Sequence, residues 1–258
     1  LSFSRILELE PFADWKINED SDQTNSGYTY FFPDEGCVDP LVAVQTLRRA
    51  AEDLGVKIVA NTNVTNVLRN KQTGNGRGIE AKTVTDDEDV EQSTIPADLV
   101  VVAAGVGAAA QGLGGLPLLH RPGQIAYASP TTTSQSRLSR ILVDPLRSSH
   151  VLQRADGSIV AGGGSLEVGG ASGTTFSSSE NKSTQSLLEG AKQLSPSVVN
   201  GAEFTHTSEA VRPMPKDGLP VVGYLQQGLY TLVTHSGITL GPLLSALAAG
   251  EIDENISC

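Results

Sequence analysis

A continuous apolar segment in the middle of the chain constrains the fold more than any other feature. Residues 99–110 are apolar or glycine throughout, and the first six of them, Leu99 to Ala104, predict a strand that is apolar on both faces. Strands of this kind are typical of a parallel sheet covered by helices on both sides. A run of 12 residues is too short to span a bilayer, so no transmembrane segment is expected. We therefore expect an α/β domain built around this strand.

The clearest helix lies before this strand. Asp39 is suited to cap it, Pro40 fits its first position, and Gly55 stands where a C-terminal glycine belongs. The helix carries an apolar stripe at spacings of three and four residues: Leu41, Val44, Leu47, Ala51 and Leu54. Short strands are predicted at three places after it: residues 56–60, 64–68 and 79–84. An acidic loop is expected over residues 86–89.

The amino-acid composition changes between residues 116 and 222, where serine and threonine become more frequent. Four short β-like runs there indicate an antiparallel sheet: residues 124–128, 140–143, 150–153 and 158–161. One helix is predicted within this region, over residues 184–194. A last strand is expected over residues 229–234, and a last helix over residues 242–249 with Pro242 near its first position. The change from α/β to antiparallel β and back indicates two domains threaded through each other.

The charge and the cysteines exclude several classes of protein. The net charge of −11 disfavours nucleic acid as a partner, because a phosphate backbone needs a cationic face, and it disfavours docking on an anionic membrane. Cys37 and Cys258 are far apart and form neither a disulfide framework nor a zinc spacing. The histidines do not pair at a metal-binding spacing either, so we expect no metal site.

One glycine motif imitates a dinucleotide-binding fingerprint. Residues 105–110 match G-x-G-x-x-A directly after the predicted strand. Such a fingerprint also needs a continuing helix and an acidic residue about 20 positions later. Here Gly112, Gly114 and Pro117 break the helix, and no acid stands near Ser129. We therefore do not interpret the motif as a primary NAD-type site, although a strand that ends in glycine lets its backbone approach a cofactor phosphate.

Two segments near the C-terminus carry more chemical information. Residues 212–223 begin with Arg212 and continue into a Pro- and Gly-rich turn. A guanidinium can bind a carboxylate through two parallel hydrogen bonds, although Arg212 taken alone is better explained as a solvated surface residue. Residues 234–242 form a turn between a strand and a helix. The free backbone N–H groups at such a turn suit an anion or an electron-rich ring.

Together these segments resemble the C-terminal signature of the FAD-dependent D-amino-acid oxidase superfamily, on the glycine oxidase and D-amino-acid dehydrogenase side. The resemblance is carried by R-P-x-x-x-D-G-x-P-x-x-G at residues 212–223 and by H-S-G-I-T-L-x-P at residues 235–242. Further pieces follow in the order of the family: residues 7–11, 36–40, 55–58, 98–105 and 121–124.

The resemblance implies an enzyme that oxidises the amine of an amino acid to an imine, with hydride transfer to FAD. The substrate is implied to be a D-amino acid, glycine or an N-methyl amino acid, and Arg212 matches the residue that docks its carboxylate. The other implied positions bind FAD: Gly237, Ile238, Thr239 and Leu240 at the pyrimidine side of the ring, Val64 at adenine, and Ala104 and Gly105 beside the pyrophosphate. No protein group is implied as a catalytic acid or base.

The resemblance also implies the fold class, an α/β (α+β) architecture. In it an FAD-binding Rossmann-like domain with a parallel sheet is interleaved with an antiparallel-sheet substrate domain. The expected boundaries place residues 1–37 in the substrate domain, 38–115 in the FAD-binding domain, 116–222 in the substrate domain, and 223–258 back in the FAD-binding domain. The family's N-terminal G-x-G-x-x-G unit is not matched, so the fold is expected to be incomplete at the N-terminus and the chain as given to be inactive.

Two other functions stay open at this point. The same fold also serves the FAD-dependent oxidation of a 2-hydroxy acid or of glycerol phosphate. Alternatively, the chain is an inactive truncated fragment that acts by protein association through an exposed sheet edge. The small number of cysteines favours an intracellular location, and the electron acceptor and the oligomeric state are not indicated by the sequence.

Overall fold

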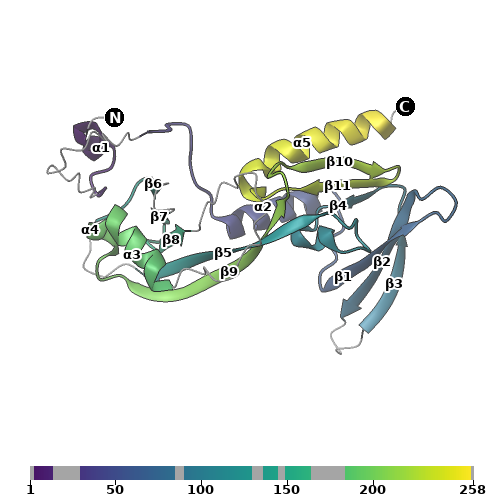
Figure 1. Cartoon of the computed structure of the whole chain (residues 1–258), viewed down its shortest axis with the longest axis horizontal. Coiled ribbons are helices and arrows are strands. Elements are labelled where there is room, and N and C mark those ends of the chain that lie inside the picture. The colour runs from purple at the N-terminus through teal and green to yellow at the C-terminus, as the bar shows by residue number, and fades with distance from the viewer. Residues whose placement is uncertain are drawn as a thin grey trace. The chain divides into compact units, whose positions relative to one another are not determined.

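The chain passes three times between two structural units. The structure is a computed structural model, and it describes residues 3–13, 30–84, 90–129, 136–144, 149–163 and 184–256. Unit 1 comprises Leu1–Asp39 and Pro122–Ala210, and unit 2 comprises Pro40–Arg121 and Val211–Cys258 (Figure 1). Each unit is therefore assembled from two separate stretches of the sequence.

Unit 1 is built on a five-stranded sheet with the strand order β6-β7-β8-β5-β9. The strands are β5 (Leu118–Ser129), β6 (Leu142–Asp144), β7 (Ser149–Gln153), β8 (Ile159–Gly163) and β9 (Glu203–Pro215). The helices of this unit are α1 (Phe3–Leu9), α3 (Thr184–Leu194) and α4 (Pro196–Val199). The strand pairs β6–β7, β7–β8 and β8–β5 are antiparallel, as the sequence predicted for this region. The expected helix over residues 184–194 is confirmed as α3.

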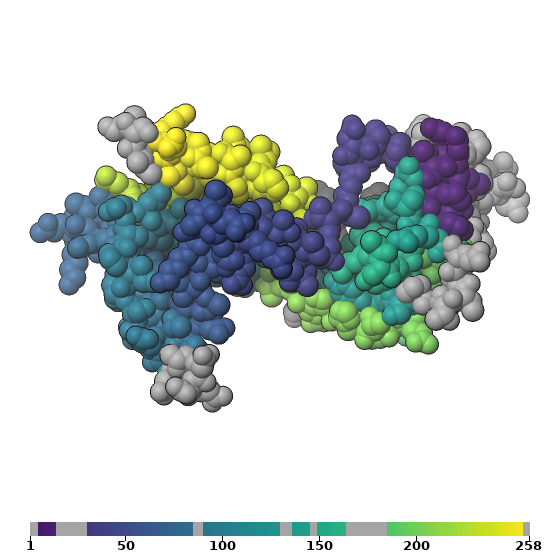
Figure 2. Space-filling view, turned by 180° about the vertical axis from the view of Figure 1, so that it is seen from behind, coloured from purple at the N-terminus to yellow at the C-terminus, as the bar shows by residue number. Residues whose placement is uncertain are grey.

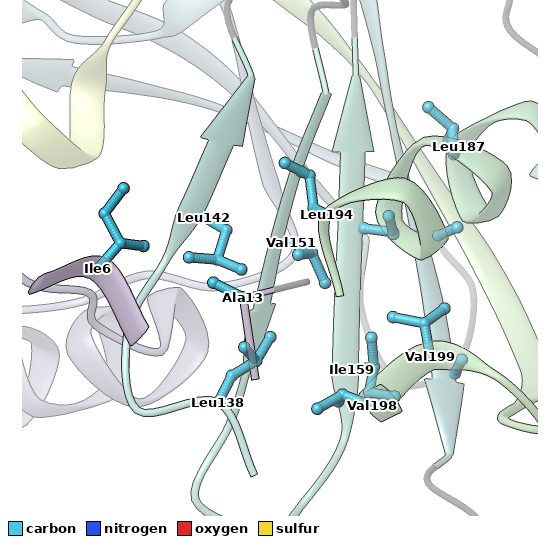
Figure 3. Close-up of a cluster of buried hydrophobic side chains, with 14 residues drawn as sticks. Ile6, Ala13, Leu138, Leu142, Val151, Ile159, Leu187, Leu194, Val198 and Val199 are labelled. Carbon is cyan, nitrogen blue, oxygen red and sulfur yellow. The ribbon is translucent and has the colours of Figure 1, made fainter. Parts of the chain in front are cut away.

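The core of unit 1 lies between one face of this sheet and its helices (Figure 3). Strand residues alternate in direction, so Val151 and Ile159 turn toward the core and are fully buried. Leu187 on α3 and Val198 on α4 are 1 % exposed and pack into the same cluster. Burial of each such side chain stabilises the fold by about 1.5–3 kcal/mol.

A buried carboxylate connects the first helix to the sheet region of unit 1. Glu10 follows α1 and is 2 % exposed. Its Oε2 accepts hydrogen bonds from the backbone N–H of Ser139 at 2.8 Å, the hydroxyl of Ser139 at 2.9 Å and the backbone N–H of Arg140 at 3.0 Å. Hydrogen bonds to a charged acceptor are about twice as strong as neutral ones. Glu10 therefore fixes the segment before β6.

Replacing Glu10 by alanine is expected to destabilise unit 1 by about 2–3 kcal/mol, because the N–H groups of Ser139 and Arg140 lose their charged acceptor. Urea unfolding followed by hydrogen exchange of peptides from residues 136–144 measures this loss. Glu8→Ala is the matched control, since Glu8 has an exposed side chain on α1 and pairs with the nearby Arg5. Equal effects of the two substitutions would contradict the role of Glu10.

Unit 2 contains two three-stranded sheets. The first is an antiparallel meander of β1 (Thr62–Arg69), β2 (Gly76–Val84) and β3 (Val90–Pro96). The second has the order β10-β11-β4 and consists of β10 (Val221–Gln226), β11 (Leu229–Val233) and β4 (Val100–Val102). Its remaining elements are α2 (Pro40–Asp53), the 3₁₀ helix η1 (Gly105–Ala109) and α5 (Gly237–Ile256). β10 is antiparallel to β11, whereas β4 is parallel to β11.

Helix α5 is held against β11 by a tyrosine. Tyr230 is fully buried, and its hydroxyl donates to Oε2 of Glu251 on α5 at 2.7 Å. Burial and the neighbouring Glu251 raise the pKa of Tyr230 to about 12, so the hydroxyl keeps its proton at physiological pH. Tyr224 on β10 meets the Tyr230 ring edge-on at 4.9 Å. This contact fixes where α5 lies on the mixed sheet.

In unit 2 the predicted strand over residues 56–60 and the predicted cover on both faces of the strand over residues 99–104 are wrong. Helix α2 is confirmed, but its apolar stripe is exposed, with Leu41 at 66 % and Leu47 at 69 % (Figure 2, α2 in dark blue). Residues 56–60 form no strand, because no described strand pairs with them, and Ile58 is 41 % exposed.

The predicted strand over residues 99–104 is shorter in the structure, where it is β4. Val101 is 47 % exposed, so the described chain covers only one face of this strand. The acidic loop at residues 86–89 lies outside the described residues.

The last helix starts earlier than its sequence indicated. Helix α5 begins at Gly237 and has Pro242 in its interior, whereas the prediction put Pro242 at the first turn of a helix over residues 242–249. Proline inside a helix leaves the carbonyl four residues before it, that of Ile238, without a helical donor. The contact of Glu251 with Tyr230 stabilises α5 despite this loss.

Candidate functional site

The parallel pairing of β4 with β11 brings two turns to one edge of the mixed sheet. Leu229 lies opposite Val100, and Thr231 lies opposite Val102, so both strands point the same way. The hydroxyl of Thr231 donates to the carbonyl of Val102 at 3.3 Å and reinforces the register. Ligands of open α/β sheets bind outside the carboxyl ends of the parallel strands. This edge is therefore where a ligand site is expected in unit 2.

The turn after β4 contains Ala104 and Gly105, two of the positions implied to bind FAD. Gly105 has a φ of +55°, and among the described residues no heavy atom lies within 4 Å of where a Cβ would stand. The chain then forms η1, a 3₁₀ helix of five residues, instead of the α-helix that a dinucleotide fingerprint needs. Ala104 is exposed, so the backbone of this turn is open to a ligand.

The turn after β11 presents backbone N–H groups at the start of a long helix. The first helical bond joins the Leu240 N–H to the carbonyl of Ser236 at 2.8 Å. Within the described part of the chain, the N–H groups of Gly237, Ile238 and Thr239 donate to no acceptor, and these three residues are exposed. The helix dipole adds a partial positive charge at this end. This donor set suits the carbonyl oxygens and ring nitrogen of a flavin pyrimidine.

Val64 lies on β1 opposite Ala81 of β2. Its side chain packs against the buried cluster of unit 2 that also contains Val102 and Ala108. The pairing of β1 with β2 shifts at Thr65, directly after Val64. The N–H of Val67 donates to the carbonyl of Gly112 in the loop after η1 at 2.6 Å. Val64 therefore lies on a strand that contacts the loop after η1, and its side chain packs in the hydrophobic core of unit 2.

Arg212 lies on β9 and shares a neighbourhood with His235 and Arg121. Its side chain is half-buried, and it forms no ion pair with a described carboxylate. Burial is the largest cause that lowers the pKa of His235, and the charges of Arg212 and then Arg121 lower it further. The Nδ1 atom of His235 lies 3.0 Å from the hydroxyl of Ser236. The cluster of two arginines and one neutral histidine is positive and adjoins the start of α5.

Sequence reasoning gave no role to two members of this cluster. Arg121 entered only as part of the segment over residues 121–124, and His235 only as part of the last motif. The proximity of Arg121 to Arg212 depends on the pairing of β5 with β9, which no local pattern shows. Arg212 and His235 stand in separate motifs, and the fold of unit 2 brings them together.

Comparison with known proteins identifies the family. The model of the DAO family of FAD-dependent oxidoreductases matches residues 1–250, and the chain belongs to this family. This confirms the resemblance seen in the sequence, and with it FAD as the cofactor on which the family depends. The bifunctional protein ThiO/ThiG of Synechocystis sp. is 30 % identical over 234 residues, which are 88 % of this chain and 32 % of that protein.

Solved structures show the same fold. Glycine oxidase from Geobacillus kaustophilus matches 81 % of this chain with a TM-score of 0.60 and 21 % identity, and the match covers 53 % of that protein. L-proline dehydrogenase from P. horikoshii matches 84 % of this chain with a TM-score of 0.65 and 16 % identity, and the match covers 56 % of that protein. The interleaved α/β fold class is thereby confirmed. The chain spans about half the length of these structures.

Among the described residues, no helix is long and apolar enough to cross a membrane. The described residues also contain no group of three or more His, Cys, Asp or Glu side chains that could hold a metal ion.

The pKa of His235 is expected to lie below 6.5 and to rise in Arg212→Gln, because one of the positive charges that lower it is removed. Imidazole chemical shifts measured by NMR across the pH range report this pKa directly. Since the folded pKa is the lower one, the unfolded chain binds the proton first, and His235 makes folding less favourable as the pH falls below 6.5. An unchanged pKa in the variant would show that Arg212 lies too far from His235 to form a common site.

Proposed function

We propose that the protein is an FAD-dependent oxidoreductase that oxidises the amine of an amino acid to an imine. The observation that carries this proposal is the meeting of three features in unit 2. The turn after β4 and the turn after β11 share one sheet edge, and the Arg212 cluster adjoins the second turn. Such a reaction needs backbone donors that hold the flavin ring and a guanidinium group that binds the substrate carboxylate.

Arg212 is proposed to bind the substrate carboxylate. Its planar guanidinium can donate two parallel hydrogen bonds to a carboxylate, which fixes both the position and the orientation of the substrate. The half-buried setting of Arg212 strengthens this interaction relative to one at a fully exposed surface. Orientation of this kind places the Cα–H bond for transfer, so no catalytic acid or base is assigned.

The cofactor positions follow from the open backbone groups. The N–H groups at the start of α5, from Gly237 to Leu240, are proposed to face the pyrimidine side of FAD, and the α5 dipole favours negative charge there. Ala104 and Gly105 are proposed to lie beside the pyrophosphate, and the backbone of Val64 beside adenine. FAD, when bound, accepts the hydride from the substrate.

The two units are proposed to have different roles, one in binding the cofactor and the other in binding the substrate. Unit 2 contains every proposed cofactor position together with Arg212 and corresponds to an FAD-binding domain. Unit 1, with its antiparallel sheet, is proposed as the substrate domain. The 258 residues contain no G-x-G-x-x-G phosphate-binding turn, so we propose that the chain alone binds FAD weakly and is inactive. The tests below therefore measure binding and not turnover.

Gly237→Pro tests the flavin site. Proline is tolerated at the first position of a helix, so this variant removes one N–H donor and leaves α5 in place. The affinity for FAD, measured by fluorescence polarisation, is expected to fall about fivefold, which is the contribution of one hydrogen bond.

Gly237→Ala is the matched control. A Cβ at this position meets no described atom within 4 Å, and alanine keeps the N–H group. Its affinity for FAD is expected to stay within about twofold of that of the unmodified chain. Equal affinities of the proline variant and the unmodified chain would overturn the proposed flavin site.

A further inference from the structure

The chain contains two Asn-Gly dipeptides, at residues 75–76 and at residues 200–201. Asparagine is one of the chemically labile residues of proteins, and a glycine after it increases this lability, because glycine has no side chain that shields its backbone nitrogen. Residues 75–76 belong to unit 2 and residues 200–201 to unit 1. The same dipeptide thus occurs in two different environments, and the contacts of each determine how stable it is.

The reaction of such a dipeptide is the loss of the side-chain amide. The backbone nitrogen of the glycine gives its proton to the solvent and forms a bond to Cγ of the asparagine. The bond between Cγ and Nδ2 breaks, and ammonia leaves with a proton taken from the solvent. Water then opens the cyclic imide at one of its two carbonyl groups and gives aspartate or isoaspartate. The reaction therefore needs a glycine nitrogen that can lose its proton and an asparagine amide that can turn toward it.

The turn at residues 75–76 blocks both requirements. The Gly76 N–H donates to the carbonyl of Gln227 at 2.9 Å, and Nδ2 of Asn75 donates to Oε1 of Gln227 at 2.8 Å. Both residues are half-buried, and a Cβ at Gly76 would collide with the carbonyl of Gly228. Attack on Cγ of Asn75 requires that this turn first separates from the turn between β10 and β11.

The connection between α4 and β9 blocks neither requirement. Asn200 and Gly201 are both exposed. Within the described part of the chain, the Gly201 N–H donates to no acceptor, and the Asn200 side chain forms no hydrogen bond. The residue before Asn200 is Val199, which is bulkier than the Gly74 that precedes Asn75, so the local sequence gives Asn200 no advantage. Any greater reactivity of Asn200 is therefore due to the fold.

We propose that Asn200 is a deamidation site of the folded chain, whereas the fold protects Asn75. The product affects unit 1, because the site lies between two residues of its core. Val199 is 2 % exposed, and Ala202 packs against the same cluster. Isoaspartate at position 200 adds one carbon to the main chain between them, and both products add a negative charge. Unit 1 is therefore expected to lose stability as the reaction proceeds.

Mass spectrometry of peptides from the full chain, incubated at physiological pH and temperature, tests this proposal. Asn200 is expected to lose its amide faster than Asn75 by about tenfold or more, because two hydrogen bonds must break before Asn75 can react. In guanidinium chloride the two rates are expected to converge, because unfolding removes these hydrogen bonds. The unfolded chain is thus the control for the effect of the local sequence.

Gln227→Ala tests the protection of Asn75. This variant removes the side chain that holds the Asn75 amide and keeps the backbone carbonyl that accepts from Gly76. The rate at Asn75 is expected to rise about fivefold, which is the contribution of one hydrogen bond. The rate at Asn200 is expected to stay unchanged in the same sample, which also reports that unit 1 remains folded.

Asn200→Gln tests the effect on unit 1. Glutamine keeps an amide but would have to close a larger ring, so it reacts far more slowly. The urea midpoint of the unmodified chain is expected to fall during the incubation, and that of Asn200→Gln is expected to stay constant.

Each outcome of these experiments decides a part of the proposal. Equal rates in the folded chain, or a faster reaction at Asn75, would overturn it. A difference that persists in guanidinium chloride would show that the sequence and not the fold sets the rates. An equal fall of the urea midpoint in Asn200→Gln would show that Asn200 is not the site that destabilises unit 1.

Discussion

The parallel pairing of β4 with β11 is the constraint on which the candidate site depends. These strands are separated by more than a hundred residues, yet their register places the turn at Gly105 beside the turn at Gly237. Antiparallel pairing would have sent the two turns to opposite edges of the sheet. The buried residues Leu229 and Val233 on β11 pack with Val102 on β4, so the hydrophobic core of unit 2 holds this register. The geometry of the site is therefore a consequence of core packing below it.

The second determinant is the long pair of β5 and β9, whose ends belong to different units. The ends within unit 1 carry the stacked pair of Tyr127 and His206, and the ends within unit 2 carry Arg121 and Arg212. His235 lies close to both arginines, and burial first and then the charges of Arg212 and Arg121 lower its pKa.

Local patterns in the sequence predicted the elements that depend on local interactions. Helix α3 was predicted with its bounds, and the glycine after α2 has the positive φ that its position implied. The prediction for residues 56–60 was wrong because a strand needs a partner, and apolar character alone does not supply one. The helix α2 itself was predicted, whereas the exposure of its apolar stripe was not, since periodicity shows that a helix has an apolar face but not whether anything covers that face.

The candidate site was predictable in part. Arg212 and the turn at Gly237 stand in contiguous motifs, and the motifs pointed to the family that the comparison then showed. Arg121 received no role, because its relation to Arg212 arises from the pairing of β5 with β9, whose residues are about ninety positions apart. His235 received none, because it stands in a different motif from Arg212 and only the fold of unit 2 brings the two together. The start of α5 was also placed too late, since proline favours the first turn of a helix and the sequence pattern therefore indicated a start at Pro242 instead of Gly237.

The most direct test of the account is a titration of the full chain with FAD, followed by NMR of the backbone amides. The account predicts that the largest shifts occur at Gly105 and at Gly237, Ile238 and Thr239, the amides at the carboxyl ends of β4 and β11. Shifts confined to other parts of unit 2, or no shifts at millimolar FAD, would contradict the claim that this sheet edge forms the flavin site.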